Sequence, residues 1–324
     1  MNWKGVIKTT TYCLDDMVEN LGLNFYQKPQ TYKTVFEIKI KNLSNEAKSI
    51  RLVLPIPSNR PNQRMLVEPN FSIAPNEIKN DRKFDNQYGV WQLNLVADEE
   101  KILMENFTIK ILPQTNKNFN KFLLDEYKKD VLDKSSLGTD NYISPDDEKI
   151  KTIVKKLGVE QNVGIILNKT NRYVIENLKY GKPIAGLYSY NEALEKDAVD
   201  CGGFSTLFAS LARAYGIPAR IVSGFWAGYK INKMHAWTEI QLPNGEWLVA
   251  DPSIEKLRQE KRTKKFGQLG AIGSDRIIFS HGSDIPIVVN GQKYKIPILQ
   301  NPHIIKTEDN SSLQIEVNLK TERL

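Results

Sequence analysis

The sequence predicts an α+β protein in which an all-β sandwich is followed by helices that pack on an antiparallel sheet. Three observations predict this class. The first third of the chain alternates apolar and polar residues with period two, as strands do. Amphipathic helical patterns begin after Pro113, and β-rich segments return from about Ser274. Because 324 residues suffice for about two domains, we expect one domain over 1–115 and a second over 116–324.

The first domain is predicted to be a sandwich because its strands are short and its turns are polar. Strands are expected over 31–42, 48–57 and 106–113, and turn-rich pieces such as "NLSNEA" separate them. No convincing helical stripe occurs between residues 25 and 113. Such a series of strands is typical of a β-sandwich. The region shows no cluster of His, Cys or carboxylate side chains, so we expect it to serve packing or partner binding.

Three amphipathic helices are predicted next. In "SPDDEKIKTIVKKLG", Ser144 is expected to be the N-cap, Pro145 the first helical residue and Gly158 the stop. The segment "QNVGIILNKTNRYVIENLKY" continues as a second helix. Ser189 and Glu192 have the spacing of a capping box and predict a short third helix.

The stretch "DAVDCGGFSTLFASLARAYGIPARIVSGF", residues 197–225, predicts a helix with a cysteine at its start. Asp200 is a natural N-cap, which puts Cys201 in the first helical turn. Gly216 can take the left-handed position after the helix, and Pro218 prevents continuation. One face of this helix is expected to be buried, and it consists of Phe204, Leu207, Phe208, Leu211 and Tyr215.

His235 and Asp251 lie on the two strands that the turn sequence "PNG" joins. With a two-residue turn at Asn244 and Gly245, Asp251 would lie opposite Thr238. His235 and Thr238 differ in parity, so His235 and Asp251 would point to opposite faces of the sheet. A His–Asp pair therefore requires a turn with an odd number of residues or a β-bulge, and we predict such an irregularity.

These residue types predict a nucleophilic site. Cys201 would attack a carbonyl group, His235 would take its proton and return it to the leaving amine, and Asp251 would fix the imidazole tautomer. The backbone N–H of Cys201 would supply one oxyanion donor. The further candidates for oxyanion or substrate binding are Gly202, Tyr180, Tyr190 and Trp226.

"DCGGFSTLFASLARAYGIPARIVSGF" and "HAWTEIQLPNGEWLVADPS", in the order Cys, His, Asp, resemble the transglutaminase-like superfamily of papain-fold thiol enzymes. The resemblance covers about 180–253 and places Cys201, His235 and Asp251 on the catalytic positions. It implies a papain-like core, and the strand-rich first part looks like the β-domain that precedes this core in bacterial and archaeal members. Members include amide cross-linkers, peptidases, peptide N-glycanases and catalytically silent scaffolds.

The first hypothesis for function is cysteine-dependent hydrolysis of amide or peptide bonds through a thioester, with a protein or peptide as substrate. Acyl transfer from protein glutamine to amines shares the first half of this reaction and is the alternative within the class. A binding scaffold with an unused triad is the alternative from another class. The oligomeric state stays open.

Composition and charge bear on nucleic-acid binding, cofactors and location. The net charge is +7, and the densest basic stretch, 256–265, is expected to be a solvated loop and not a nucleic-acid site, because no aromatic residues interleave with its charges. No cofactor or metal is expected, since there is no Cys pair and no His–Cys cluster at ligand spacing. No apolar run is long enough for a membrane span, and the N-terminus lacks a secretory apolar core, so we expect a cytoplasmic protein. Cys13 is expected to be a packing residue.

Overall fold

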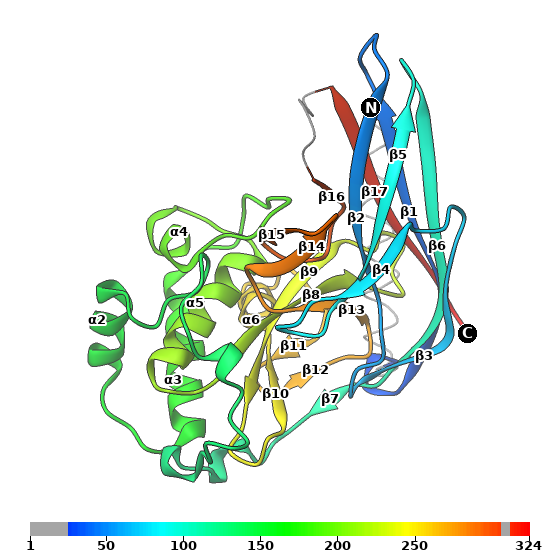
Figure 1. Cartoon of the computed structure of the whole chain (residues 1–324). Coiled ribbons are helices and arrows are strands. Elements are labelled where there is room, and N and C mark those ends of the chain that lie inside the picture. The colour runs from blue at the N-terminus through cyan, green and yellow to red at the C-terminus, as the bar shows by residue number, and fades with distance from the viewer. Residues whose placement is uncertain (1–24, 306–311) are drawn as a thin grey trace, which may run out of the picture.

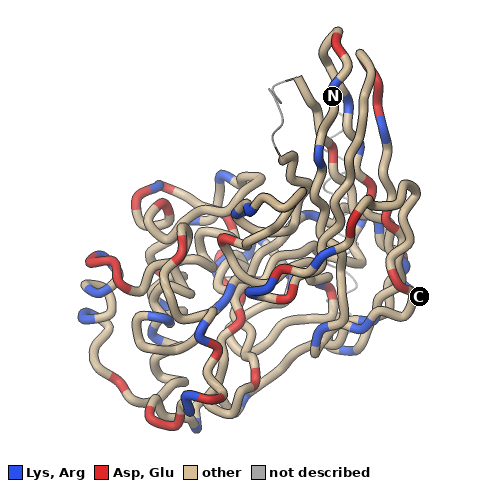
Figure 2. The backbone as a smooth tube through the Cα atoms, viewed as in Figure 1, with Lys and Arg blue, Asp and Glu red and all other residues tan. Residues whose placement is uncertain are grey.

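The computed structural model describes residues 25–305 and 312–324, and its architecture is the predicted α+β fold. In Figure 1 the long strands of the sandwich stand on one side and the helices on the other, with a mixed-length antiparallel sheet between them. Cys13 lies outside the described residues. Figure 2 shows that Lys and Arg residues and Asp and Glu residues are both scattered over the described backbone.

The sandwich consists of two four-stranded antiparallel sheets, with the orders β17-β1-β6-β3 and β16-β2-β5-β4. The strands are β1 (Gln30–Asn42), β2 (Lys48–Ile56), β3 (Gln63–Phe71), β4 (Glu77–Asn80), β5 (Gln87–Leu95), β6 (Glu100–Ile111), β16 (His303–Ile305) and β17 (Leu313–Arg323). The three predicted strands correspond to β1, β2 and β6, although β6 begins at Glu100 and ends at Ile111 instead of spanning 106–113. Alternate residues of β1 and β6 point inward and are buried.

Two strands of the sandwich come from the C-terminal end of the chain. β17 pairs with β1 along eleven residue pairs, from Tyr32 with Arg323 to Asn42 with Leu313, and β16 pairs with β2. Both fall inside the predicted second domain, 116–324, yet complete the sheets of the first. The boundary at residue 115 stays a prediction, and the sheet order shows that the chain returns across it.

The second part of the chain carries its helices on one side of the sheet β10-β9-β8-β13. The helices are α2 (Glu148–Leu157), α3 (Val163–Asn177), α4 (Tyr190–Glu195), α5 (Cys201–Ala214) and α6 (Pro252–Gln259). The sheet strands are β8 (Ala219–Trp226), β9 (Met234–Gln241), β10 (Trp247–Ala250) and β13 (Arg276–His281). Smaller pairings involve β7 (Gln114–Thr115), β11 (Gly267–Gln268), β12 (Ala271–Ile272), β14 (Ile285–Val289) and β15 (Gln292–Ile296). The 3-10 turns are η1 (Phe25–Gln27), η2 (Phe119–Lys121), η3 (Leu124–Glu126) and η4 (Lys134–Ser136).

Helix caps match the sequence pattern at most ends. Ser189 and Glu192 form the predicted capping box of α4, and Asp200 caps α5. The predicted N-cap of α2 is wrong: Asp147, not Ser144, accepts the hydrogen bond from the backbone N–H of Lys149. Both residues are good caps, and the helix starts three residues later than Ser144 predicts because Asp147 supplies the carboxylate.

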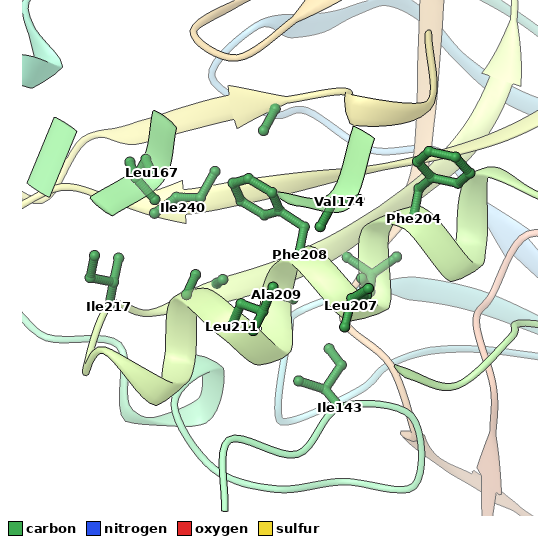
Figure 3. Close-up of a cluster of buried hydrophobic side chains, with 14 of the residues drawn as sticks. Ile143, Leu167, Val174, Phe204, Leu207, Phe208, Ala209, Leu211, Ile217 and Ile240 are labelled. Carbon is green, nitrogen blue, oxygen red and sulfur yellow. The ribbon is translucent and has the colours of Figure 1, made fainter. Parts of the chain in front are cut away.

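The helix α5 is the centre of the core. Figure 3 shows Phe204 and Phe208 on the side of α5 that faces α3 and β9, while Leu207 points toward Ile143. Phe204, Leu207 and Phe208 are fully buried. Because α5 is packed on several sides, its N-terminus and the residue there are held rigidly.

The sandwich and the central sheet share one core. Phe225 of β8 and Phe279 of β13 lie in the same apolar cluster as Phe36 of β1 and Phe107 of β6. The ring centroids of Phe36 and Phe279 are 5.2 Å apart. The sandwich therefore fixes the β8–β13 half of the sheet on which the candidate site is built.

Candidate active site

Cys201 is the first residue of α5, as predicted. The Asp200 carboxylate accepts hydrogen bonds from the N–H groups of Gly202 (2.9 Å) and Ile184 (3.0 Å), which fixes the start of the helix. Cys201 itself is partly exposed. Its thiol faces the backbone N–H of Ala236 on β9, and this hydrogen bond favours the thiolate.

The surroundings of Cys201 nevertheless hold it protonated. Burial of the sulfur and the negative charge of Asp200 raise the pKa of the Cys201 thiol, and together they outweigh the hydrogen bond from Ala236. A helix N-terminus contributes only about 0.3–1 kcal/mol to an anion. Cys201 is therefore a neutral thiol at rest, and a role as nucleophile would require a base that takes its proton.

The imidazole of His235 is bound to Asp251. His235 Nε2 and Asp251 Oδ2 are 2.7 Å apart, and both side chains are buried. The predicted irregularity of the hairpin is confirmed: Trp247 pairs with Gln241 and Ala250 with Thr238, and residues 243–245 form a three-residue loop. Asp251 then follows the pair Ala250–Thr238 and shares a face with His235.

Both carboxylate oxygens of Asp251 accept hydrogen bonds. As the N-cap of α6 it accepts hydrogen bonds at Oδ1 from the Ile254 N–H (3.1 Å) and the Ser253 hydroxyl (3.0 Å). Burial alone would raise its pKa, but His235 and the Arg276 guanidinium hold the pKa of Asp251 well below its usual range. The group is therefore an ionised acceptor at neutral pH.

This charge state assigns the tautomer of His235. A carboxylate only accepts hydrogen bonds, so Nε2 carries the proton and Nδ1 keeps its lone pair. Burial lowers the pKa of His235, although Asp251 opposes the shift. The imidazole is thus neutral at rest and presents a basic nitrogen.

Arg276, the first residue of β13, is a site residue that the sequence interpretation missed. Its guanidinium donates to Asp251 Oδ2 (2.9 Å), to Asp275 Oδ1 (2.8 Å) and to the Phe266 carbonyl (2.7 Å). The side chain is 1% exposed. The available signal was a charged residue that opens the apolar strand "RIIFS", since an arginine in a buried strand requires a partner.

Two aromatic residues predicted for the site lie beside it. Trp226 stacks on the His235 ring with centroids 4.5 Å apart, and the Arg276 guanidinium lies 4.1 Å from the Trp226 ring centre. Tyr180 packs against Phe204 of α5, and burial raises the pKa of its hydroxyl. Both rings belong to one apolar cluster with Ile254 and Leu257 of α6. Trp226 therefore restricts the imidazole to one plane.

Gly202 and Tyr190 have other contacts. The Gly202 N–H is engaged by Asp200, and a Cβ on Gly202 would lie 2.9 Å from the Leu187 side chain of this same chain. Its small size thus serves packing. The Tyr190 hydroxyl donates to Asp147 at the start of α2 (2.9 Å). Neither contact joins these residues to His235 or Asp251, so their predicted substrate roles stay predictions.

Among residues 25–305 and 312–324, no group of three or more His, Cys, Asp or Glu side chains could hold a metal ion. In the same residues, no helix is long and apolar enough to cross a membrane.

The candidate site combines a thiol at a helix start with a buried His–Asp pair on the adjacent hairpin. Residues 152–252 match the family model described as the Transglutaminase-like superfamily. The matched segment contains Cys201 and His235 and reaches Asp251.

Solved structures of two other proteins align with the chain. A Cytophaga hutchinsonii protein named a "putative cysteine protease" aligns with 91% of this chain and 98% of its own, at 15% identity and a TM-score of 0.54. The periplasmic domain of TgpA from Pseudomonas aeruginosa bound to ethylmercury aligns with 72% of this chain and 93% of its own, at 15% identity and a TM-score of 0.38. A search of the curated proteins gave no match.

Proposed function

We propose that the chain hydrolyses amide bonds of a protein or peptide through a thioester on Cys201. The observation that carries the proposal is the buried His235–Asp251 pair, 2.7 Å apart. His235 lies on β9, and the next backbone N–H of that strand, from Ala236, faces the Cys201 thiol. The transglutaminase-like core of residues 152–252 supports it, and the structural neighbour named a "putative cysteine protease" has the same fold.

The reaction begins with proton transfer from Cys201 Sγ to His235 Nδ1, because that nitrogen holds the free lone pair. The thiolate attacks the carbonyl carbon, and His235 returns the proton to the amine as the C–N bond breaks. Water then attacks the thioester while His235 takes one of its protons, and Sγ leaves as the free thiol. Asp251 stabilises the imidazolium in both halves and keeps its own charge.

The test is product analysis by mass spectrometry after incubation with a peptide mixture, with and without added primary amine. We expect new carboxyl termini with the wild type and with Cys13→Ala, and none with Cys201→Ala or His235→Ala. Amine adducts in place of carboxyl termini would show acyl transfer instead. An unreactive Cys201 and no product in either arm would contradict the proposal and favour the binding scaffold.

A cytoplasmic location stays a prediction.

A further inference from the structure

The basic stretch 256–265, "KLRQEKRTKK", lies at the candidate active site. It holds six Lys or Arg residues and a single acidic residue, Glu260, which is a large share of the chain's net charge of +7. Glu260 is shared by two of the basic groups, Arg262 at 2.8 Å and Lys256 at 3.3 Å. Positive charge therefore predominates over this short segment. The expectation of a solvated loop over 256–265 is wrong for its first four residues, which belong to α6.

The C-terminal end of the loop that follows α6 is connected to the His235–Asp251 pair through Arg276. The Phe266 carbonyl accepts a hydrogen bond from Arg276, which also binds Asp251. Gly267 follows, and a Cβ there would lie 2.6 Å from Arg276 Nη2 and 2.9 Å from Asp251 Oδ2. Only a glycine permits this close approach without a shift of the buried pair. The basic residues just before Phe266 are thus held beside the site.

Two of these basic residues contact the aromatic rings next to the nucleophile and its base. Lys265 Nζ lies 4.1 Å from the centre of the Trp226 ring, and Trp226 stacks on His235. The Arg262 guanidinium lies 5.9 Å from the centre of the Tyr180 ring and approaches the Tyr180 carbonyl at 3.4 Å. Lys261, Arg262 and Lys264 are exposed. Positive charge therefore flanks the site on its Tyr180 side and on its Trp226 side.

We propose that loop 261–265 is a specificity element that selects acidic peptide segments, with carboxylate side chains near the scissile amide. The proposal rests on the proposed amide hydrolysis. A peptide is favoured over a nucleic acid because the thiol–imidazole chemistry requires an acyl carbon, which a phosphodiester lacks. Clustered positive charge raises the local concentration of anionic substrates and speeds their association, most strongly at low salt.

The first test does not depend on turnover. Cys201 is alkylated in parallel with anionic iodoacetate and neutral iodoacetamide at low salt, and Cys13 in the same molecule is the reference. We expect the iodoacetate-to-iodoacetamide rate ratio at Cys201 to fall several-fold in Lys261→Gln/Arg262→Gln/Lys264→Gln. The matched control removes three exposed charges from α2, by Lys151→Gln/Lys155→Gln/Lys156→Gln, and should keep the wild-type ratio.

The second test measures binding of labelled Glu-rich, Gln-rich and Lys-rich peptides to Cys201→Ala by fluorescence anisotropy. We expect the Glu-rich peptide to bind at least tenfold more tightly than the Gln-rich one, and the loop variant to lose this preference. An unchanged alkylation ratio together with equal peptide affinities overturns the inference. Tighter binding of a single-stranded oligonucleotide than of the Glu-rich peptide also overturns it. Absence of hydrolysis with charge selection intact would instead refute the proposed reaction alone.

Discussion

Glu105 of β6 is expected to make the fold less stable as the pH rises. Its side chain points into the sandwich, is 1% exposed, and pairs across the sheet with Phe36 and Phe71. Neither carboxylate oxygen has a hydrogen-bond partner among the residues that the structure describes. Burial raises the pKa of Glu105 well above its usual value, so the folded state keeps the proton that the unfolded state releases.

The magnitude follows from this difference in bound protons. An unfolded Glu titrates near pH 4.3, roughly. Between that pH and the folded-state pKa, the unfolded state binds about one proton fewer, and the free energy of unfolding falls by about 1.4 kcal/mol per pH unit. Below the unfolded pKa this contribution is fully present, and above the folded pKa it is lost. Over two pH units the loss is about 2.8 kcal/mol, which is a large part of a typical domain stability of about 5–15 kcal/mol.

The assay is urea unfolding of the wild type and Glu105→Gln at pH 4.5, 5.5 and 6.5, which all lie above the unfolded-state pKa of about 4.3. The stability difference, variant minus wild type, should grow by about 1.4 kcal/mol per unit of pH. Glu100→Gln, at an exposed position on the same strand, is the matched control and should follow the wild type at every pH. Parallel pH profiles for the wild type and Glu105→Gln would refute the reasoning, because Glu105 would then titrate alike in both states.

Three further predictions concern the site. Arg276→Met leaves Asp251 without one buried partner and should destabilise the fold by about 3–5 kcal/mol, measured by urea unfolding; Arg276→Lys should recover part of it, and equal stability would contradict the argument. Asp200→Asn keeps a capping oxygen but removes the charge that raises the pKa of Cys201, so iodoacetamide should alkylate Cys201 faster at pH 7; an unchanged rate would count against that charge effect. Gly267→Ala, whose Cβ would lie 2.6 Å from Arg276 Nη2, should cost about 1–3 kcal/mol in thermal unfolding, whereas wild-type stability would show that the loop moves freely.

Local sequence patterns predicted most helix ends and the position of Cys201 at the start of α5. The capping box of Ser189 and Glu192 and the cap of Asp200 before Cys201 depend on residues within four positions of one another, so sequence spacing decides them. For His235 and Asp251 to share a face of the sheet, the turn between their strands needed an odd number of residues. The loop at 243–245 has three. Such features are fixed by chain geometry over short distances.

The remaining features depend on contacts between distant segments. The hydrogen bond from Arg276 to Asp251 spans 25 positions, and β17 pairs with β1 across most of the chain. No periodicity in β17 specifies its partner, because any strand with a buried face satisfies the same pattern. The cap of α2 was predicted at Ser144 and lies at Asp147, because both side chains can cap a helix and the local sequence does not decide between them.

The charged groups around His235 favour the enzyme over the scaffold. Asp251, Asp275 and Arg276 are each at most 1% exposed, and burying such groups costs several kcal/mol per ion before their mutual attraction offsets it. Well-packed apolar residues would fill the same volume at equal or better stability, so a binding scaffold has no need of them. Their effect on chemistry is specific, because Asp251 sets the proton on His235 Nε2 and leaves Nδ1 free, while Arg276 holds Asp251 ionised. The arrangement therefore supports the proposed proton transfer from Cys201 to His235.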